Sequence, residues 1–537
     1  NNNFLLLLGE GFMIINNGIN EETILHVWNW SFKTIKENIR EIVNAGYTWI
    51  QVSPVQGTKD KSLVVKDWWM LYQPINFKIG NFQLGSREEF IGMCAEAHRY
   101  GLKVMVDVIL NHMANRGGGN DSNFPHETVE SFIRDDINFW HERKKVEDWD
   151  DRWQVTHWCI GLPDLNTSNH MLQDIIIDFL NDVIECGADG LRFDAAKHIE
   201  LPEDPGGSDF WPRVIGALKN KERLLLYGEV LQCGASNYEK YIKYMRLSAE
   251  GYSYAIRKTV GYKSEKNINN AKEYQVPYGV NGSNLVTWIE SHDDYASDIE
   301  KSFELSQWQI KMGWAIIASR SESIPLFFNR PKGKIWLEGT MGEAGNDFWK
   351  SSEIVAINKF RLKMKGEKEN IITLGNNLMI VERGNKGVIM INIGGHYDIN
   401  IYTNLKDGIY KDKISDKLFY VRDGRLNGTV EEGRISIIYH ELEEDFIEKD
   451  IYYLRDNKVF FTNPLRWDKA RVYIYKEGNY KSTELSPWPG REMYREGENL
   501  YSYPIEDYWI SGRVIFTNGN TQIPEFAKEG LPILKNK

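Results

Sequence analysis

Short apolar runs alternate with amphipathic stretches over residues 22–335. Three stretches carry the 3.6-residue period of a helix that packs one face on a core, namely Phe32–Ala45, Arg87–Tyr100 and Met171–Cys186. The apolar runs have the length of buried strands, and they are Thr23–Trp30, Tyr47–Ser53, Leu102–Asn111, Gly190–Ala195, Leu224–Val230, Leu285–His292 and Ile324–Asn329. Strand and helix repeated in this way predict an α/β fold with a parallel sheet, and about eight units predict a closed (β/α)8 TIM barrel.

The remaining segments predict one insertion and two further β units. Residues 113–163 break the rhythm with Gly117–Gly119 and scattered charges, so we expect an inserted subdomain after the third strand. Turn signals such as Asn376-Asn377 and Asp423-Gly424 predict a small antiparallel domain, and a second β unit follows the acidic stretch Glu441–Asp445, which we expect to be a linker. The expected divisions are 20–112 and 164–365 for the barrel, 113–163 for the insertion, 366–446 for the antiparallel domain and 450–537 for the last unit.

Composition and charge narrow the classes of partner. The net charge of −11 argues against nucleic acid and against an anionic membrane surface. The 18 Trp, 27 Tyr and 23 Phe suit either large cores or the binding of flat, partly apolar faces such as sugar rings. The four cysteines lie far apart with no C-x-x-C pair, which favours free buried thiols over a zinc or redox site. The apolar stretches Phe4–Leu8 and Phe12–Ile15 fit a signal-peptide remnant or an N-terminal strand equally well.

Polar residues stand on one face of a predicted buried strand. In "GLRFDAAKHIE", Arg192 and Asp194 are two residues apart and therefore point the same way, whereas Leu191 and Phe193 point the other way. Burying such a charged pair is costly unless the charges are matched. The pair therefore indicates a functional site.

Carboxylates follow several of the predicted strands. Asp107, Asp194, Glu229 and Asp293 each stand at or just beyond a strand end, where a barrel of this class has its active site. Any one of them alone is most simply a cap or a surface charge. Together, on one face of one architecture and with histidines beside them, they suit glycoside hydrolysis, which needs one acid and one nucleophilic or water-activating carboxylate.

Several blocks of the chain resemble the α-amylase family of glycoside hydrolases. "VDVILNH", "GLRFDAAKH", "GEV" and "ESHD" are similar to its four signature regions, in the same order. The blocks "ILHVWNWSF", "WMLYQP", "TWIESHDDYASD" and "ASRSESIPLFFNRP" are more similar still to secreted bacillar α-amylases, and the resemblance covers nearly all of the chain from about residue 22.

The resemblance implies an endo-acting, retaining α-amylase that hydrolyses α-1,4-glucosidic bonds of starch and glycogen. Asp194 would be the nucleophile, Glu229 the general acid/base and Asp293 the third acid, which steadies the transition state. The carboxyl groups of Asp194 and Glu229 are then expected about 5–5.5 Å apart. The residues implied to bind substrate are Trp69, Tyr72, Gln73, His112, Arg192, Lys197, His198 and His292.

The resemblance also implies a calcium ion and a sugar-binding module. The side chains of Asn111 and Asp164 and the backbone carbonyls of Thr156 and His198 would hold Ca²⁺, with a second ion considered near Gly187 and Asp189. "VFFTNPLRWDKARVYIY", "PWPG" and "VIFTNGN" resemble a starch-binding module of β-sandwich type, whose aromatic platform would be Tyr473, Tyr475 and Trp488 unless that face belongs to the core.

Two alternatives stay open. One is another enzyme of the same family, a maltogenic amylase or a glucanotransferase. The other is a non-catalytic glucan-binding protein, against which the presence of all three acids argues. By resemblance we expect an extracellular monomer with α-glucans as partners.

Overall fold

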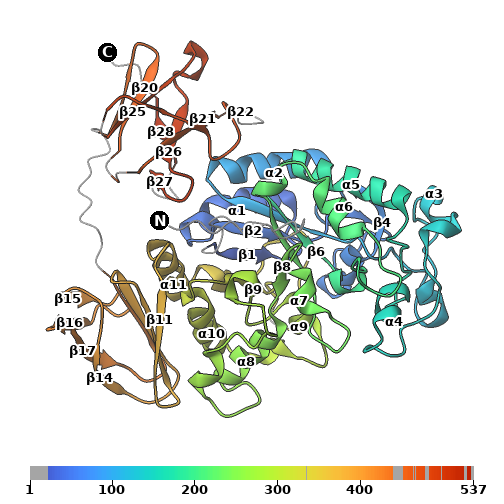
Figure 1. Ribbon diagram of the computed structural model, residues 1–537, viewed down its shortest axis with the longest axis horizontal. Helices are drawn as coiled ribbons and strands as arrows, with labels where there is room; N and C mark the ends of the chain where they lie inside the picture. The colour runs from blue at the N-terminus through green and yellow to red at the C-terminus, as the bar shows by residue number, and fades with distance from the viewer. Residues whose placement is uncertain are drawn as a thin grey trace, which may run out of the picture.

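The computed structural model describes residues 22–333, 335–439, 451–463, 465, 467–477, 483–497, 499–524 and 529–533. The N-terminal apolar stretches and the expected linker Glu441–Asp445 lie outside this part. Its centre is a closed barrel of eight parallel strands in the order β1-β10-β9-β8-β7-β6-β5-β2 (Figure 1). The strands are β1 Ile24–Val27, β2 Trp49–Val52, β5 Lys103–Val108, β6 Gly190–Phe193, β7 Leu225–Gly228, β8 Arg246–Ser248, β9 Leu285–Thr287 and β10 Ile324–Phe328. The barrel prediction is therefore confirmed.

Helices pack around the barrel and bury their apolar faces against it. α1 buries Phe32, Ile35 and Ile39, and its N-terminus is capped by Ser31, whose hydroxyl accepts from the Thr34 N–H. The helices are α1 Phe32–Asn44, α2 Arg87–Arg99, α5 His170–Glu185, α6 Phe210–Gly216, α7 Tyr238–Tyr241, α8 Glu250–Thr259, α9 His292–Ala296, α10 Gln307–Ser319 and α11 Ser352–Lys363. Among the described helices, none is both long and apolar enough to cross a membrane.

The segment 113–163 contains two short helices, α3 Ser131–Arg134 and α4 Arg152–His157. Isolated bridges such as His112↔Asp164 and Trp140↔Leu165 hold its return to the barrel. A separate small sheet of β3 Gln56–Thr58 and β4 Pro74–Ile79 lies between β2 and α2. These excursions all leave from the carboxyl ends of barrel strands and so build up the walls of that end.

Two all-β parts follow the barrel. The first has two antiparallel four-stranded sheets, β11-β12-β13-β18 and β14-β17-β16-β15. Its strands are β11 Glu369–Leu374, β12 Leu378–Arg383, β13 Gly387–Asn392, β14 Tyr397–Tyr402, β15 Gly408–Lys411, β16 Leu418–Arg422, β17 Arg425–Val430 and β18 Ile435–Tyr439. The antiparallel prediction for this part is confirmed.

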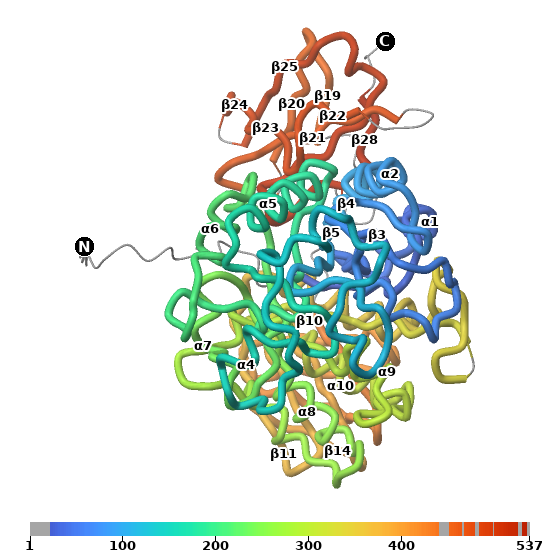
Figure 2. Tube along the Cα trace, turned by 90° about the vertical axis from the view of Figure 1, so that its right-hand side faces the viewer, coloured from blue at the N-terminus to red at the C-terminus, as the bar shows by residue number. Residues whose placement is uncertain are grey.

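The last part, which we call the C-terminal module, packs two sheets face to face around Val459, Phe461, Val472 and Phe516. Its strands are β19 Tyr452–Arg455, β20 Lys458–Thr462, β21 Arg471–Lys476, β22 Thr483–Glu484, β23 Arg491–Glu492, β24 Tyr494–Arg495, β25 Leu500–Pro504, β26 Arg513–Thr517, β27 Gln522–Ile523 and β28 Leu531–Pro532. Both views place the module beside α2 (Figures 1 and 2). An ion pair of 2.5 Å between Arg99 Nη2 at the end of α2 and Glu477 Oε1 joins the two.

The cysteine prediction is partly wrong. All four thiols are free, and Cys94, Cys159 and Cys186 are buried, but Cys233 is exposed. Cys233 lies in the loop after β7, at the carboxyl end of the barrel, rather than in an element that packs on the core. Its Sγ is 3.9 Å from Lys197 Nζ.

Candidate active site

Arg192 is the centre of a buried charge cluster at the carboxyl end of the barrel. Parallel pairing sets Asp107, Arg192 and Tyr227 side by side on β5, β6 and β7. Arg192 Nη1 lies 2.7 Å from Asp194 Oδ1 and 3.0 Å from Asp107 Oδ1, and its Nη2 lies 3.3 Å from Glu229 Oε1. One guanidinium group thus contacts three carboxylates, each from a different strand or strand end.

Glu229 and Asp293 complete the acids at this end of the barrel. Glu229 follows β7 directly, and its Oε2 accepts a 2.9 Å hydrogen bond from the N–H of Ala195. Ala195 has a left-handed backbone (φ 49°), and this turn points its N–H at Glu229. Asp293 lies in the first turn of α9 and is about half exposed. The three predicted acids therefore line one cleft, of about 650 Å³.

Aromatic and imidazole rings form the floor of this cleft. Tyr72 and His292 stack with ring centroids 5.0 Å apart, and the Tyr72 hydroxyl donates to Asp107 Oδ2 at 3.0 Å. His112 Nε2 lies 3.0 Å from the Tyr72 carbonyl and 3.9 Å from Asp194 Oδ2. His292 Nε2 is 3.4 Å from Asp293 Oδ2. Each imidazole therefore stands beside one acid.

Trp69 and Gln73 also line the cleft. Trp69 is 38% exposed, so one indole face is open to a ligand, and Lys59 Nζ lies 5.4 Å from its ring centroid. Gln73 is buried, and its Oε1 has no hydrogen-bond partner within the described part of the chain. An unpaired amide oxygen in a cleft is an acceptor available to a ligand hydroxyl.

Burial governs the protonation of the site. It lowers the pKa of His112 to about 4 and that of His292 to about 3, so both rings are neutral near pH 7. Burial also raises the pKa of Asp194, against the opposing charge of Arg192. For Glu229, Arg192 and the Ala195 N–H outweigh burial and lower the pKa. Burial and the repulsion between neighbouring carboxylates favour a proton on Asp194 and Asp107, whereas Arg192 favours the ionised form of each acid.

Asp293 differs from these buried acids. Burial within the cleft and the charge of Glu229 raise its pKa. About half of its side chain is open to solvent, which screens the charge of Glu229. Asp293 thus lies at the edge of the cleft, with a side chain more open to solvent than that of Asp194 or Glu229.

Lys197 and His198 line the cleft on the side of the inserted segment. His198 Nδ1 contacts the Val155 carbonyl of α4 at 2.8 Å, and burial lowers its pKa to about 3. Arg152, also on α4, donates to the Lys197 carbonyl at 2.6 Å and pairs with Asp204 Oδ2 at 2.6 Å. The insertion is therefore fastened to the loop after β6 by a buried ion pair.

The residues expected to bind calcium come together in part. Asn111 Nδ2 lies 3.0 Å from Asp164 Oδ1, and His141 Nδ1 lies 2.7 Å from Asp164 Oδ2. Rotating the Asn111 amide group by 180° would exchange its nitrogen and oxygen, so that Oδ1 instead of Nδ2 faces this position. Thr156 follows Val155, to which His198 is hydrogen-bonded. In donor chemistry the set fits a hard cation, since amide, carboxylate and carbonyl oxygens are the ligands Ca²⁺ prefers.

Two further observations bear on metals. Glu200 is fully buried near Asp164, and its Oε1 has no hydrogen-bond partner among the described residues. At the second position considered, Asp189 Oδ2 already accepts from the Val104 N–H and contacts His98 Nε2, both at 2.8 Å. Within the described ranges, no cluster of three His, Cys, Asp or Glu side chains is arranged to hold a metal.

The predicted platform of the C-terminal module lies on a covered face. Tyr473 and Tyr475 share one face of β21, with ring centroids 5.7 Å apart, and pack with Ile515 and a half-buried Trp488, apart from the module core. Both tyrosines are at most 2% exposed. The same strand leads to Glu477, which contacts α2, so this face points at the barrel. The expectation of an open platform is therefore not met in this arrangement.

Several cleft residues were not among the predicted site residues. Asp107 was recognised as a strand-end acid without a role, yet it shares Arg192 with Asp194. Tyr254, Trp288 and Glu300 line the cleft from segments after β8 and β9. Periodicity missed β8, because its three residues, Arg246–Ser248, carry no apolar run, and the segments that follow it were not placed at the cleft.

Comparisons with known proteins agree with this architecture. Residues 31–305 match the family described as "Alpha amylase, catalytic domain", and residues 459–528 match "Starch-binding module 26". An α-amylase of Clostridium acetobutylicum is 42% identical over 427 residues, which cover 78% of this chain and 54% of that protein. The chain spans about half the length of the curated relatives it matches.

Two solved structures share the fold. The α-amylase I of Eisenia fetida superposes with a TM-score of 0.63 at 20% identity, over 79% of this chain and 98% of the other. The γ-CGTase of alkalophilic Bacillus clarkii superposes with a TM-score of 0.65 at 15% identity, over 96% of this chain and 83% of the other.

Proposed function

The chain belongs to the α-amylase family, and from that premise we propose that it is an endo-acting α-amylase. Its substrates would be starch, glycogen and related α-1,4-glucans, cleaved at internal bonds with retention of anomeric configuration. The observation that carries the proposal is the contact of Arg192 with both Asp194 and Glu229 in a cleft lined by aromatic rings. Two carboxyl groups bridged by one guanidinium support the short separation of a retaining enzyme.

In this mechanism Glu229 gives its proton to the glycosidic oxygen while an Asp194 oxygen attacks the anomeric carbon. The C–O bond to the leaving glucan breaks, and a covalent glycosyl ester on Asp194 forms. Water then gives a proton to Glu229 and attacks the same carbon, which releases Asp194 and restores the α-anomer. Neutral His112 donates its one N–H to the Tyr72 carbonyl and so keeps its ring fixed beside Asp194. Neutral His292 can donate a hydrogen bond to a sugar oxygen, and Asp293 stabilises the positive charge that develops on the ring.

The proton retained by the acid cluster must lie on Glu229 when the reaction starts. In the free site, burial favours protonation of Asp194, and Arg192 favours the ionised form of Glu229. A glucan that displaces water and places its glycosidic oxygen beside Glu229 would shift the proton toward that residue. Arg192 remains paired with Asp194 and keeps the nucleophile ionised.

A time course on soluble amylose, followed by anomeric NMR, tests the proposal with wild type and Asp194→Asn. We expect early α-anomeric oligosaccharides of mixed length, absent from the variant. Larger or cyclic glucans without new reducing ends would instead identify a glucanotransferase, the activity named for one structural neighbour. Glucan binding without any product would identify a non-catalytic binding protein.

We propose calcium as the ion held between Asn111 and Asp164. The donor chemistry and the buried Glu200 Oε1, which has no hydrogen-bond partner among the described residues, support it. Calcium there would neutralise buried carboxylates and tie the insertion to the barrel.

We also propose that the C-terminal module binds starch and that the protein acts outside the cell as a monomer. The match to a starch-binding module supports a polymeric, often insoluble substrate. Such a module adds affinity by raising the local substrate concentration.

A further inference from the structure

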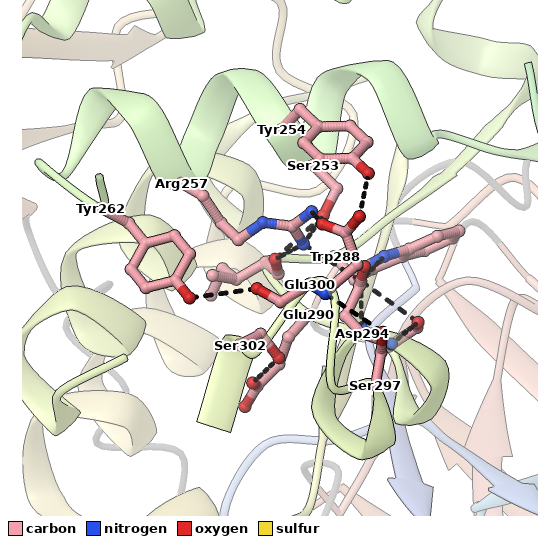
Figure 3. Close-up of polar contacts among 12 residues, drawn as sticks. Ser253, Tyr254, Arg257, Tyr262, Trp288, Glu290, Asp294, Ser297, Glu300 and Ser302 are labelled. Atoms are coloured by element: carbon pink, nitrogen blue, oxygen red, sulfur yellow. Dashed lines mark hydrogen bonds and ion pairs between the residues drawn. The ribbon is translucent and has the colours of Figure 1, made fainter. Parts of the chain in front are cut away.

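A polar cluster next to the catalytic acids lies outside the residues used so far. It is centred on Arg257, which is 3% exposed on α8 (Figure 3). Arg257 Nη1 lies 3.0 Å from Asp294 Oδ2, 2.9 Å from Ser253 Oγ and 2.9 Å from the Ile289 carbonyl. Its Nη2 is 3.6 Å from Glu300 Oε2 and makes no hydrogen bond within the described part of the chain.

The guanidinium supports a tyrosine on the wall of the cleft. Arg257 Cζ lies 4.6 Å from the ring centroid of Tyr254, so a cation covers one face of this ring. The Tyr254 hydroxyl donates to Glu300 Oε1 at 2.7 Å. Figure 3 shows the ring above the guanidinium with its hydroxyl directed at the Glu300 carboxylate. Tyr254 is nevertheless 37% exposed, and both residues line the cleft.

The segment that carries Glu300 is fixed at both sides. The Glu300 N–H donates to Ser297 Oγ at 3.1 Å, and the Tyr262 hydroxyl donates to the carbonyls of Glu300 and Lys301 at 3.1 and 2.7 Å. The carboxylate keeps a side-chain exposure of 30%. A rigid, partly open carboxylate therefore lies beside a rigid, partly open aromatic ring, and both can contact a ligand with little loss of side-chain freedom.

We propose that Tyr254 and Glu300 form an outer binding position for a glucosyl unit of the α-glucan chain. The proposal rests on the proposed function and adds to it a position that governs preference for substrate length. The open face of the Tyr254 ring would pack against the apolar face of a pyranose. Glu300 would accept hydrogen bonds from its hydroxyls, and charge-assisted bonds of this kind are about twice as strong as neutral ones.

Arg257 acts on this position and on the catalytic acids together. Asp294 follows Asp293 directly, and its Oδ2 accepts from the Ser291 N–H at 2.8 Å and from Trp288 Nε1 at 3.2 Å, besides its bond to Arg257. Arg257 thus positions both Glu300 and the turn that carries Asp293. Binding energy from an outer sugar can in this way help to hold Asp293 in position for the reaction.

The test compares substrates of two lengths. For each variant, kcat/KM for maltoheptaose is divided by kcat/KM for maltotriose, which has four fewer glucosyl units and so fills fewer positions along the cleft. We expect Tyr254→Ala to lower this ratio about tenfold, and Glu300→Gln about threefold. Tyr254→Phe keeps the ring and should restore most of the ratio. Tyr278→Ala is the matched control, since Tyr278 is fully exposed and does not line the cleft.

An unchanged ratio in Tyr254→Ala would overturn the inference, whether both kcat/KM values stay at the wild-type level or both fall equally, the latter of which would indicate a structural role. Calorimetric binding of both oligosaccharides to Glu229→Gln, with and without Tyr254→Ala, gives the same comparison without turnover. If wild type released no reducing ends, the proposed function would fail. A length-dependent loss of binding would still support the outer position.

Discussion

Arg192 Nη1 lies 2.7 Å from Asp194 Oδ1, two residues further along the same chain. The same nitrogen also contacts Asp107. A single cation therefore divides its charge between the proposed nucleophile and a second buried carboxylate, while its other nitrogen reaches Glu229. Removing any member of this cluster therefore changes the electrostatics of the others.

Replacing Glu229 by Gln removes the group that gives and takes the proton. We expect kcat on soluble starch to fall about 10³-fold or more, because general acid–base catalysis contributes roughly 10²–10⁴-fold. Calorimetric binding of maltoheptaose should stay within a few fold of wild type. Asp194→Asn should abolish turnover equally, and near-normal kcat in either variant would contradict the assigned roles.

Replacing Asp107 by Asn should move the pH profile. Asp107 is a negative neighbour that raises the pKa of Asp194. Without it, more of the Arg192 charge acts on Asp194 and Glu229, so their shared proton leaves at lower pH. The alkaline limb of kcat/KM should therefore shift to lower pH, by on the order of one unit. Asp189→Asn, at the opposite end of the barrel, should leave the limb in place, and a shift to higher pH in Asp107→Asn would refute the sign.

Calcium should stabilise the protein through Asp164. At about 100 times its dissociation constant the ion contributes about 2.7 kcal/mol, which corresponds to a rise in Tm of roughly 4 °C for a domain of about 340 residues. Differential scanning calorimetry of EDTA-treated protein, with and without added Ca²⁺, measures it. Asp164→Asn should lose the response, whereas Asp189→Asn should keep it. A response that survives Asp164→Asn would place the ion elsewhere.

The Arg152–Asp204 ion pair should be important for stability. Asp204 is buried, and Asp204→Ala leaves the Arg152 guanidinium without its carboxylate, so we expect a loss of about 3 kcal/mol in the free energy of unfolding. Urea unfolding measures it. Glu37→Ala breaks the exposed pair with Lys33 and should change stability by less than about 0.5 kcal/mol. Similar values for both variants would mean that the insertion is held by other contacts.

Adsorption to starch granules should depend on release of the covered face. Trp488→Ala, or removal of residues after about 448, should weaken adsorption while activity on soluble substrate persists. Glu477→Gln removes the ion pair with Arg99, worth about 0.5–1 kcal/mol, and should strengthen adsorption two- to five-fold. Weaker adsorption of Glu477→Gln would mean that the docked arrangement is the one that binds.

The sequence pattern predicted the barrel because apolar runs and helical periods are local features of the chain. The prediction of Phe32–Ala45 as a helix matches α1 to within one residue. The sequence pattern did not predict β8, because Arg246, Leu247 and Ser248 have no apolar pattern. They form a strand only because they pair with neighbouring strands on both sides. Tyr254 and Glu300 meet across 46 residues, and no local signal reports such a contact. The burial of Tyr473 likewise depends on Ile515 of the neighbouring strand and on Trp488, which only the folded module brings beside it.

The contact between Arg99 and Glu477 also places the C-terminal module at one end of the barrel. α2 ends just before β5 begins, so the C-terminal module sits at the amino end of the barrel strands, and the cleft opens at the other end. A glucan chain bound to the docked module would have to pass around the outside of the barrel to reach Asp194. With the module docked, its covered face and the catalytic acids lie toward opposite ends of the barrel, so the proposed starch contacts of the module and the cleft cannot share one short stretch of a glucan chain.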